Sequence, residues 1–202
     1  MRTLREFLEE FKVVIVAGSP IDALKIIRVA RRYGLNLVVV FREEECPSNV
    51  LKVRSQGCEF VFEVTMASAV IEVWGPGRIV MGVDPGTVYV GMVLVVNGVL
   101  LATNTYDSLL KVLGLINELR KYLMIKEFRV KVGRSESNPE FSEFIKGGRR
   151  MPGVSMYLVS EERASLVSLR MLEGRTGQMS KHEEAALRIL LTPLKYCKEV
   201  KS

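Results

Sequence analysis

Three short stretches of the sequence carry side chains that could do chemistry together. Asp84 lies in Gly82-Val83-Asp84-Pro85-Gly86-Thr87, directly after an apolar run, and Glu161-Glu162-Arg163 follows another apolar run. The third stretch, Lys181-His182-Glu183-Glu184, opens a helical pattern near the end of the sequence. A carboxylate at a strand end, before a turn of little side-chain bulk, is exposed and firmly aimed, and Mg²⁺ binds such oxygen ligands. The stretches therefore predict a divalent-metal site.

Each stretch also has a purely structural interpretation. Asp84-Pro85-Gly86 is a common turn, and the acids Glu161 and Glu162 favour the N-terminal end of a helix dipole. Ser180 and Glu183 have the spacing of a capping box. For His182, the only histidine, the structural alternative is a partly buried polar group facing inward from the helix.

Taken in this order, the three stretches resemble the RuvC/YqgF group of nucleases and Holliday junction resolvases, within the ribonuclease-H-like superfamily, over about residues 78–192. The resemblance implies that Asp84 and Glu162 bind Mg²⁺ or Mn²⁺. It also implies that His182 stands where related proteins carry a third acidic ligand. The expected catalytic residues are thus Asp84, Glu162 and His182, and the expected metal ligands are Asp84, Glu162 and Glu183.

Two positions depart from the RuvC pattern. Ala185 stands where RuvC-like proteins have a further aspartate, and residues 128–133 offer Val130, Lys131 and Val132 where those enzymes place a glutamate. The resemblance is therefore closer to YqgF. The third ligand remains open between His182 and Glu183.

Basic residues on and after the predicted strands at 128–133 and 154–160 suggest contacts to nucleic-acid phosphates. A solvated basic loop is the alternative. The expected contacts are Lys131, Arg134, Lys146, Arg149, Arg150 and Arg163.

The elements that must position these residues begin with strands at 78–84, 88–96 and 99–106. Asn97-Gly98 predicts a tight hairpin between the second and third strands. A helix capped by Asp107 is expected to about Leu123. The elements expected after it are a strand at 128–133, a short helix near 139–146, a strand at 154–160, a helix from about Ala164 to Glu173, a loop at 174–178 and a helix at 181–191. This order predicts a mixed five-stranded ribonuclease-H-like sheet, with three antiparallel strands followed by alternating helices and strands.

The preceding residues predict a small open parallel α/β unit. Strands are expected at 12–17, 35–41 and 59–64, with a short helix within 65–74. A helix between the first two strands is capped by Ser19 and ended by Gly34. Its expected inward positions are Ile21, Leu24, Ile27 and Ala30. Because Gly75-Pro76-Gly77 breaks both patterns, the expected division is a Rossmann-like domain at 1–76 and a ribonuclease-H-like domain at 77–202. Docking or homodimerisation is expected of the first domain.

Composition narrows the class of protein. The sequence is 48% hydrophobic and has a formal charge of +6, which suits a packed protein with a polyanionic partner. It has no signal peptide and no apolar run long enough to cross a bilayer, so a soluble cytoplasmic protein without a membrane partner is expected. The three cysteines form no CxxC pair, which disfavours disulfides and structural zinc. Scarce Gln and abundant Glu, Lys and Arg resemble thermophile composition.

The expected function is a divalent-metal-dependent nuclease acting on DNA or structured RNA. The alternative is a catalytically degenerate ribonuclease-H-like module for nucleic-acid binding or assembly, favoured by the departures at the third ligand. An actin-like kinase, whose phosphate loop also has a strand followed by Asp, Gly and Thr, would need a second such domain and a longer sequence.

Overall fold

A computed structural model describes residues 1–169 and 179–200. Its main sheet has seven strands in the order β1-β7-β6-β5-β8-β9-β10. These are β1 (Arg2–Thr3), β5 (Gly77–Pro85), β6 (Val90–Val96), β7 (Val99–Tyr106), β8 (Ile125–Gly133), β9 (Val154–Val159) and β10 (Cys197–Glu199).

The five middle strands have the ribonuclease-H-like arrangement. In chain order they run 3-2-1-4-5, with β6 antiparallel to both β5 and β7 and with β5, β8 and β9 parallel. The predicted fold class is confirmed. The short edge strands β1 and β10, parallel to β7 and antiparallel to β9, were not predicted, because two or three residues carry no periodic pattern.

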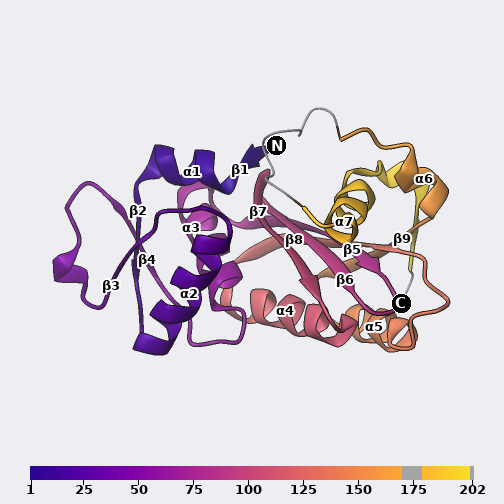
Figure 1. Ribbon diagram of the computed structural model, residues 1–202, viewed down its shortest axis with the longest axis horizontal. Coiled ribbons are helices and arrows are strands. Elements are labelled where there is room, and N and C mark those ends of the chain that lie inside the picture. The colour runs from indigo at the N-terminus through magenta and orange to yellow at the C-terminus, as the bar shows by residue number, and fades with distance from the viewer. Residues whose placement is uncertain (170–178, 201–202) are drawn as a thin grey trace.

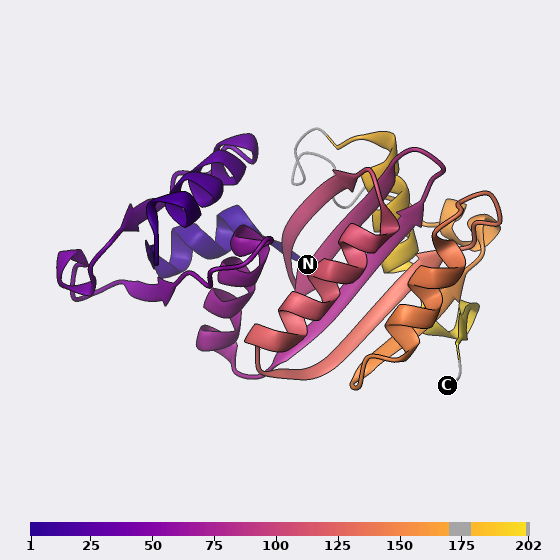
Figure 2. The same ribbon diagram turned by 90° about the horizontal axis from the view of Figure 1, so that it is seen from below.

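Helices cover both faces of this sheet. Figures 1 and 2 show α4 (Leu109–Tyr122) and α5 (Phe141–Arg149) on one face and α7 (Lys181–Leu191) on the other. Between β9 and α7 lies the short α6 (Glu161–Ser165), and a 3-10 turn, η3 (Leu194–Tyr196), follows α7. None of the described helices is long and apolar enough to cross a membrane.

The second sheet is small and parallel, with strand order β3-β2-β4. Its strands are β2 (Val13–Val16), β3 (Val38–Val40) and β4 (Leu51–Arg54); α1 (Leu4–Phe11), α2 (Pro20–Arg32) and the 3-10 turn η1 (Glu43–Glu45) accompany them. The predicted parallel pair around α2 is confirmed. The predicted strand at 59–64 is wrong, because Val61 begins the helix α3 (Val61–Trp74). That helix is apolar on nearly all sides, so its sequence lacks the one-sided pattern that distinguishes a helix from a buried strand.

The predicted ends of α2 are correct, but of its predicted inward positions only Ala30 is buried. Ser19 accepts a hydrogen bond from the Asp22 amide, and Gly34 is left-handed, with φ +62°. The buried apolar residues are Ala23, Ile26 and Ala30, whereas Ile21 and Leu24 are 66% and 67% exposed. Both exposed side chains line an open groove between α2 and the start of α3. The buried stripe is rotated by about one residue from the predicted one.

One hydrophobic core extends across the predicted domain boundary. It contains Phe7 and Ile15 from the N-terminal elements, Phe62 from α3, and Met81 and Leu115 from the ribonuclease-H-like part. Helix α3 also contacts β5, β7 and α4. The division at residue 76 therefore stays a prediction about chain organisation, while the packing joins the two parts.

Three local predictions can be compared directly. Asn97 and Gly98 have φ values of +47° and +83°, as the predicted hairpin turn requires. Ser108, not Asp107, caps α4, and Asp107 instead pairs with Lys111 at 2.7 Å. Helix α6 begins at Glu161, earlier than predicted, because the Ser160 side chain accepts from the Arg163 amide. The helix also ends at Ser165, so the predicted continuation is wrong at residues 166–169, which are described and not helical. The part of the predicted helix from residue 170 and the loop at 174–178 lie outside the described residues.

Candidate active site

Three parallel strands end at one edge of the main sheet, which brings distant parts of the sequence together. Asp84 is near the end of β5, Arg134 follows β8, and residues 160–163 follow β9. The start of α7 reaches the same edge from above the sheet. This edge is the candidate active site.

Two glycines allow α7 to lie directly on the strands. A Cβ atom on Gly82 would overlap the main-chain oxygen of Ala186, and one on Gly91 would overlap that of His182. Gly91 is also the partner of Asp84 across the β5–β6 ladder. The absence of a side chain at Gly91 therefore places the first turn of α7, with His182, next to Asp84.

Asp84 and His182 form a close pair. The distance from His182 Nδ1 to Asp84 Oδ2 is 3.1 Å, and each side chain is 25% exposed. Burial raises the pKa of the Asp84 carboxyl; the hydrogen bond and the charge of His182 oppose this, and the charge of Glu161 adds to it. When Asp84 is ionised, Nδ1–H donates to it, so in the neutral form of the imidazole Nε2 is the unprotonated nitrogen.

The turn after Asp84 is held by a residue that the sequence analysis missed. Asn138, which is 8% exposed, donates from Nδ2 to the Gly86 carbonyl at 2.7 Å. Its Oδ1 accepts from the Glu140 amide at 2.9 Å. A signal was present, since an asparagine before a proline is typical of an ordered turn.

The two glutamates after β9 lie at the start of α6, both exposed. The Glu161 carboxylate is close enough for its charge to raise the pKa of Asp84. Glu162, the residue selected from the sequence, occupies the same exposed first turn. Among residues 1–169 and 179–200, no three His, Cys, Asp or Glu side chains are grouped to hold one metal ion. The structure therefore brings together Asp84 and His182, with Glu161 nearby, but no preformed three-ligand cage.

The expectation that Glu183 is a metal ligand was wrong in this structure. Its carboxylate is 6% exposed and accepts from the Ser180 amide at 2.7 Å, which completes a capping box, while Arg32 lies 3.8 Å away. Successive residues of a helix point about 100° apart. Because His182 faces Asp84, Glu183 faces away from it.

Lys131 was also wrongly expected to contact phosphate. It is 7% exposed, and its Nζ donates to the main-chain oxygens of Leu190 and Thr192 at 2.7 and 2.6 Å. These carbonyls lie at the C-terminal end of α7, where helical carbonyls lack intrahelical partners. Lys131 therefore fastens α7 to β8.

The remaining basic residues do not form one patch. Arg134 is exposed at the edge that carries Asp84, and Arg163, also exposed, has its guanidinium 4.9 Å from the centre of the Tyr196 ring. Lys146, Arg149 and Arg150 are exposed on and after α5, across the sheet from α7. Because α5 runs back toward the start of β9, Arg149 and Arg150 lie toward the opposite edge. Of the six predicted phosphate contacts, Arg134 and Arg163 lie at the edge of the sheet that carries Asp84.

No family model matches this sequence, and no curated protein matches it. Among solved structures, the chain is similar to RuvC from Thermus thermophilus, with 15% identity and a TM-score of 0.47 over 61% of this chain and 100% of that one. It is also similar to T. thermophilus RuvC in complex with a Holliday junction substrate, with 16% identity and a TM-score of 0.42 over 61% and 99% of the two chains. Both likenesses are distant, and the fold assignment above depends on strand order and direction.

Proposed function

We propose that this protein is a divalent-metal-dependent nuclease that hydrolyses phosphodiester bonds in structured DNA or RNA. The observation that carries this proposal is the Asp84–His182 pair at the C-terminal edge of a ribonuclease-H-like sheet. Two glycines, Gly82 and Gly91, keep the helix close enough to form it. A nuclease nearer to the YqgF-like than to the RuvC-like proteins fits best, because β8 carries Val130, Lys131 and Val132 where RuvC-like enzymes are expected to have a glutamate.

The donor atoms suit Mg²⁺ or Mn²⁺. Mg²⁺ commonly takes one or two carboxylates and fills its other positions with water and substrate phosphate. Asp84 would supply one carboxylate and Glu161 or Glu162 the second. A bound ion would lower the pKa of water and neutralise charge on the phosphate. His182 would orient the Asp84 carboxylate and offer Nε2 as a proton acceptor.

The distribution of charge supports a nucleic-acid partner. Residues 77–202 contain nineteen Lys or Arg and thirteen Asp or Glu, so the whole formal excess of +6 falls in this part of the sequence. Arg134 and Arg163 are exposed cations that follow β8 and β9 at the edge that carries Asp84. A basic excess in the part that carries the candidate site favours approach of a phosphate backbone.

The test is cleavage of branched DNA and of structured RNA with Mg²⁺ or Mn²⁺. Asp84→Asn should reduce cleavage by a factor of about 100, at least as much as the loss of a residue that supports a metal ligand. Asp107→Asn is the matched control, because its carboxylate is 67% exposed and pairs only at the surface with Lys111; it should cleave like the wild type. Equal cleavage by wild type and Asp84→Asn, or no metal-dependent cleavage, would refute the nuclease proposal.

The second candidate is a binding or assembly module whose catalytic site has degenerated. The observation in its favour is that the described residues contain no group of three possible ligands. His182→Asp discriminates between the two candidates, because it adds a carboxylate beside Asp84. A sharp rise in cleavage would indicate a degraded site, whereas a fall would indicate that His182 itself works in an intact one.

A further inference from the structure

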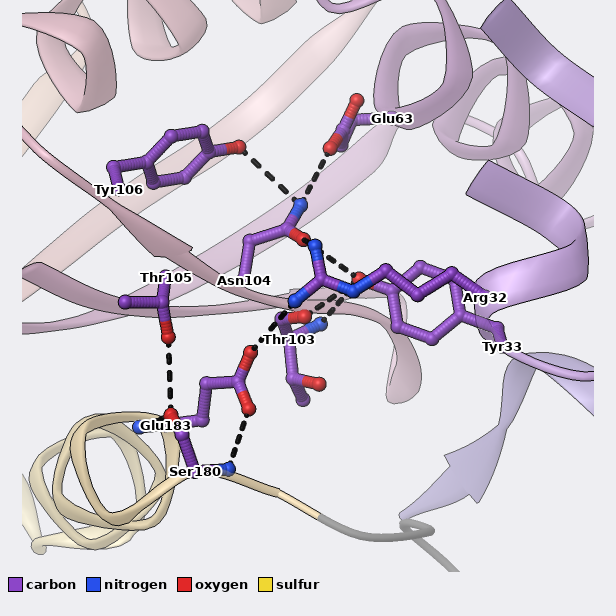
Figure 3. Close-up of polar contacts among 9 residues, drawn as sticks. All are labelled: Arg32, Tyr33, Glu63, Thr103, Asn104, Thr105, Tyr106, Ser180 and Glu183. Carbon is purple, nitrogen blue, oxygen red and sulfur yellow. Dashed lines mark hydrogen bonds and ion pairs between the residues drawn. The ribbon is translucent and has the colours of Figure 1, made fainter. Parts of the chain in front are cut away.

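A series of polar contacts joins α2 to the start of α7 through strand β7 (Figure 3). At its centre is Asn104 of β7, which is 7% exposed. Its Oδ1 accepts from Arg32 Nη1 at 3.3 Å and lies 3.1 Å from Tyr33 Oη. Its Nδ2 donates to Glu63 of α3 at 2.8 Å. One buried amide thus connects α2, α3 and β7.

The first turn of α7 is attached to the same group of residues. Ser180 Oγ lies 3.0 Å from Thr105 Oγ1 of β7, next to Asn104. Glu183, paired with Ser180 in the capping box, has Oε1 3.8 Å from Arg32 Nη2. The Arg32 guanidinium therefore contacts β7 with one nitrogen and faces α7 with another, as Figure 3 shows.

His182 lies in this same turn, between Ser180 and Glu183. Glu183 points to the polar group around Arg32, and His182 points to Asp84. Because the Glu183 and His182 side chains project from the same helical turn, a displacement of that turn would change the geometry of the Asp84–His182 pair.

We infer that Arg32 is a positioning residue for the Asp84–His182 pair, and that the N-terminal α/β unit is thereby a working part of the site. The catalytic meaning of this role rests on the proposed function above. Arg32 contributes in two ways. Its charge faces a nearly buried carboxylate, which is costly without a partner, and its planar fork spans two acceptors on different elements, which a lysine cannot do equally well.

The experiment compares Arg32→Met and Arg32→Lys with Arg31→Met in the full chain. Arg31 is the matched control, because it is the preceding, exposed residue of the same helix. His182 is the only histidine in the sequence, so its imidazole gives a single set of NMR signals that reports on the Asp84 pair directly. Amide exchange of residues 183–185 reports on the first turn of α7.

Arg32→Met should shift the His182 signals and speed exchange in the first turn about five- to tenfold, as expected for a loosened helix N-terminus. Arg32→Lys should give an intermediate effect, and Arg31→Met should match the wild type. If the protein is a nuclease, Arg32→Met should lower kcat about tenfold, as for other residues that hold a metal-binding or catalytic side chain in place. KM should change little, because Arg32 is not expected to touch the substrate.

Unchanged His182 signals and unchanged exchange in Arg32→Met would overturn the inference. If the His182 signals change but neither the wild type nor the variants cleave nucleic acid, the proposed nuclease activity is refuted and the positioning role is supported. The two failures are therefore distinguishable. If Arg32→Met does not fold, Arg32→Lys and Glu183→Gln provide the same comparison. Glu183→Gln keeps an acceptor for Ser180 but removes the charge that faces Arg32, and it should move the His182 signals in the same direction.

Discussion

A buried carboxylate in α3 makes the stability of this protein depend on pH. Glu63 is 5% exposed and accepts a hydrogen bond from Asn104 at 2.8 Å. Burial raises its pKa from 4.5 to about 7, and hydrogen bonds with Asn104 and Tyr106 offset only part of that rise. The folded protein therefore holds a proton on Glu63 at pH values where the unfolded chain has released it.

The sign and size of the effect follow from linkage. Because the folded pKa is the higher one, the native state binds more protons than the unfolded state between about pH 4.5 and 7, and the free energy of unfolding falls as pH rises through that window. The difference between the two pKa values corresponds to roughly 3 kcal/mol lost above pH 7. Glu63→Gln cannot ionise and keeps an oxygen acceptor for Asn104, so it should be more stable than the wild type by roughly 2–3 kcal/mol at pH 8 and nearly equal to it at pH 4.5.

Urea unfolding at pH 4.5, 6 and 8 measures this difference. Other titrating groups contribute equally to both proteins and cancel in the comparison. Glu72→Gln is the control, since Glu72 is exposed on the same helix, and its effect should not depend on pH. A Glu63→Gln protein that is equally destabilised at every pH would show that the network requires the charge and that the reasoning above is wrong.

Three further substitutions test how the fold positions the site. Gly91→Ala should cost about 1–3 kcal/mol through overpacking and should alter the NMR signals of His182, whose main chain the new Cβ would overlap; a neutral effect on both would refute the close-packing argument. Lys131→Met should cost about 2–4 kcal/mol in urea unfolding because it removes the charged donor from two main-chain oxygens at the end of α7, whereas Arg134→Met, at an exposed position, should stay within about 0.5 kcal/mol. Phe7→Ala should lower the unfolding free energy by about 3–5 kcal/mol in a single transition, since Phe7 belongs to the shared core; two separate transitions would show that the two parts unfold independently.

The elements of the ribonuclease-H-like sheet could be predicted because their patterns are local. Asn97-Gly98 defines the hairpin, and the bounds of α7 agree with the prediction at both ends. The elements of the N-terminal part were harder to predict from the sequence. Helix α3 is apolar on nearly every side, and β1 and β10 are too short to show alternation. The strands β1 and β10 form only because they pair with β7 and β9, which are distant in the sequence.

Individual residues of the candidate site could be predicted from the sequence, but the contacts between them and the rest of the fold could not. The sequence indicates Asp84 and His182, and the structure places them 3.1 Å apart. The sequence contains no sign that Lys131 is buried or that Glu183 faces Arg32, because both contacts depend on where α7 lies on the sheet. Gly82 and Gly91 allow α7 to lie at that position. A glycine in a strand pattern does not indicate which helix will pack against it.

The pairing of β1 with β7 has a consequence for the order of folding. Arg2 and Thr3 are aligned with Val99 and Leu100, and α1 follows β1 directly. During synthesis, the three parallel strands of the small sheet emerge long before β7 exists, so β1 has no partner until about a hundred further residues have been made. Contacts between such distant residues form late because closing the intervening loop costs entropy first. We therefore expect the attachment of the N-terminal segment to be a late step, completed only after the β6–β7 hairpin has formed.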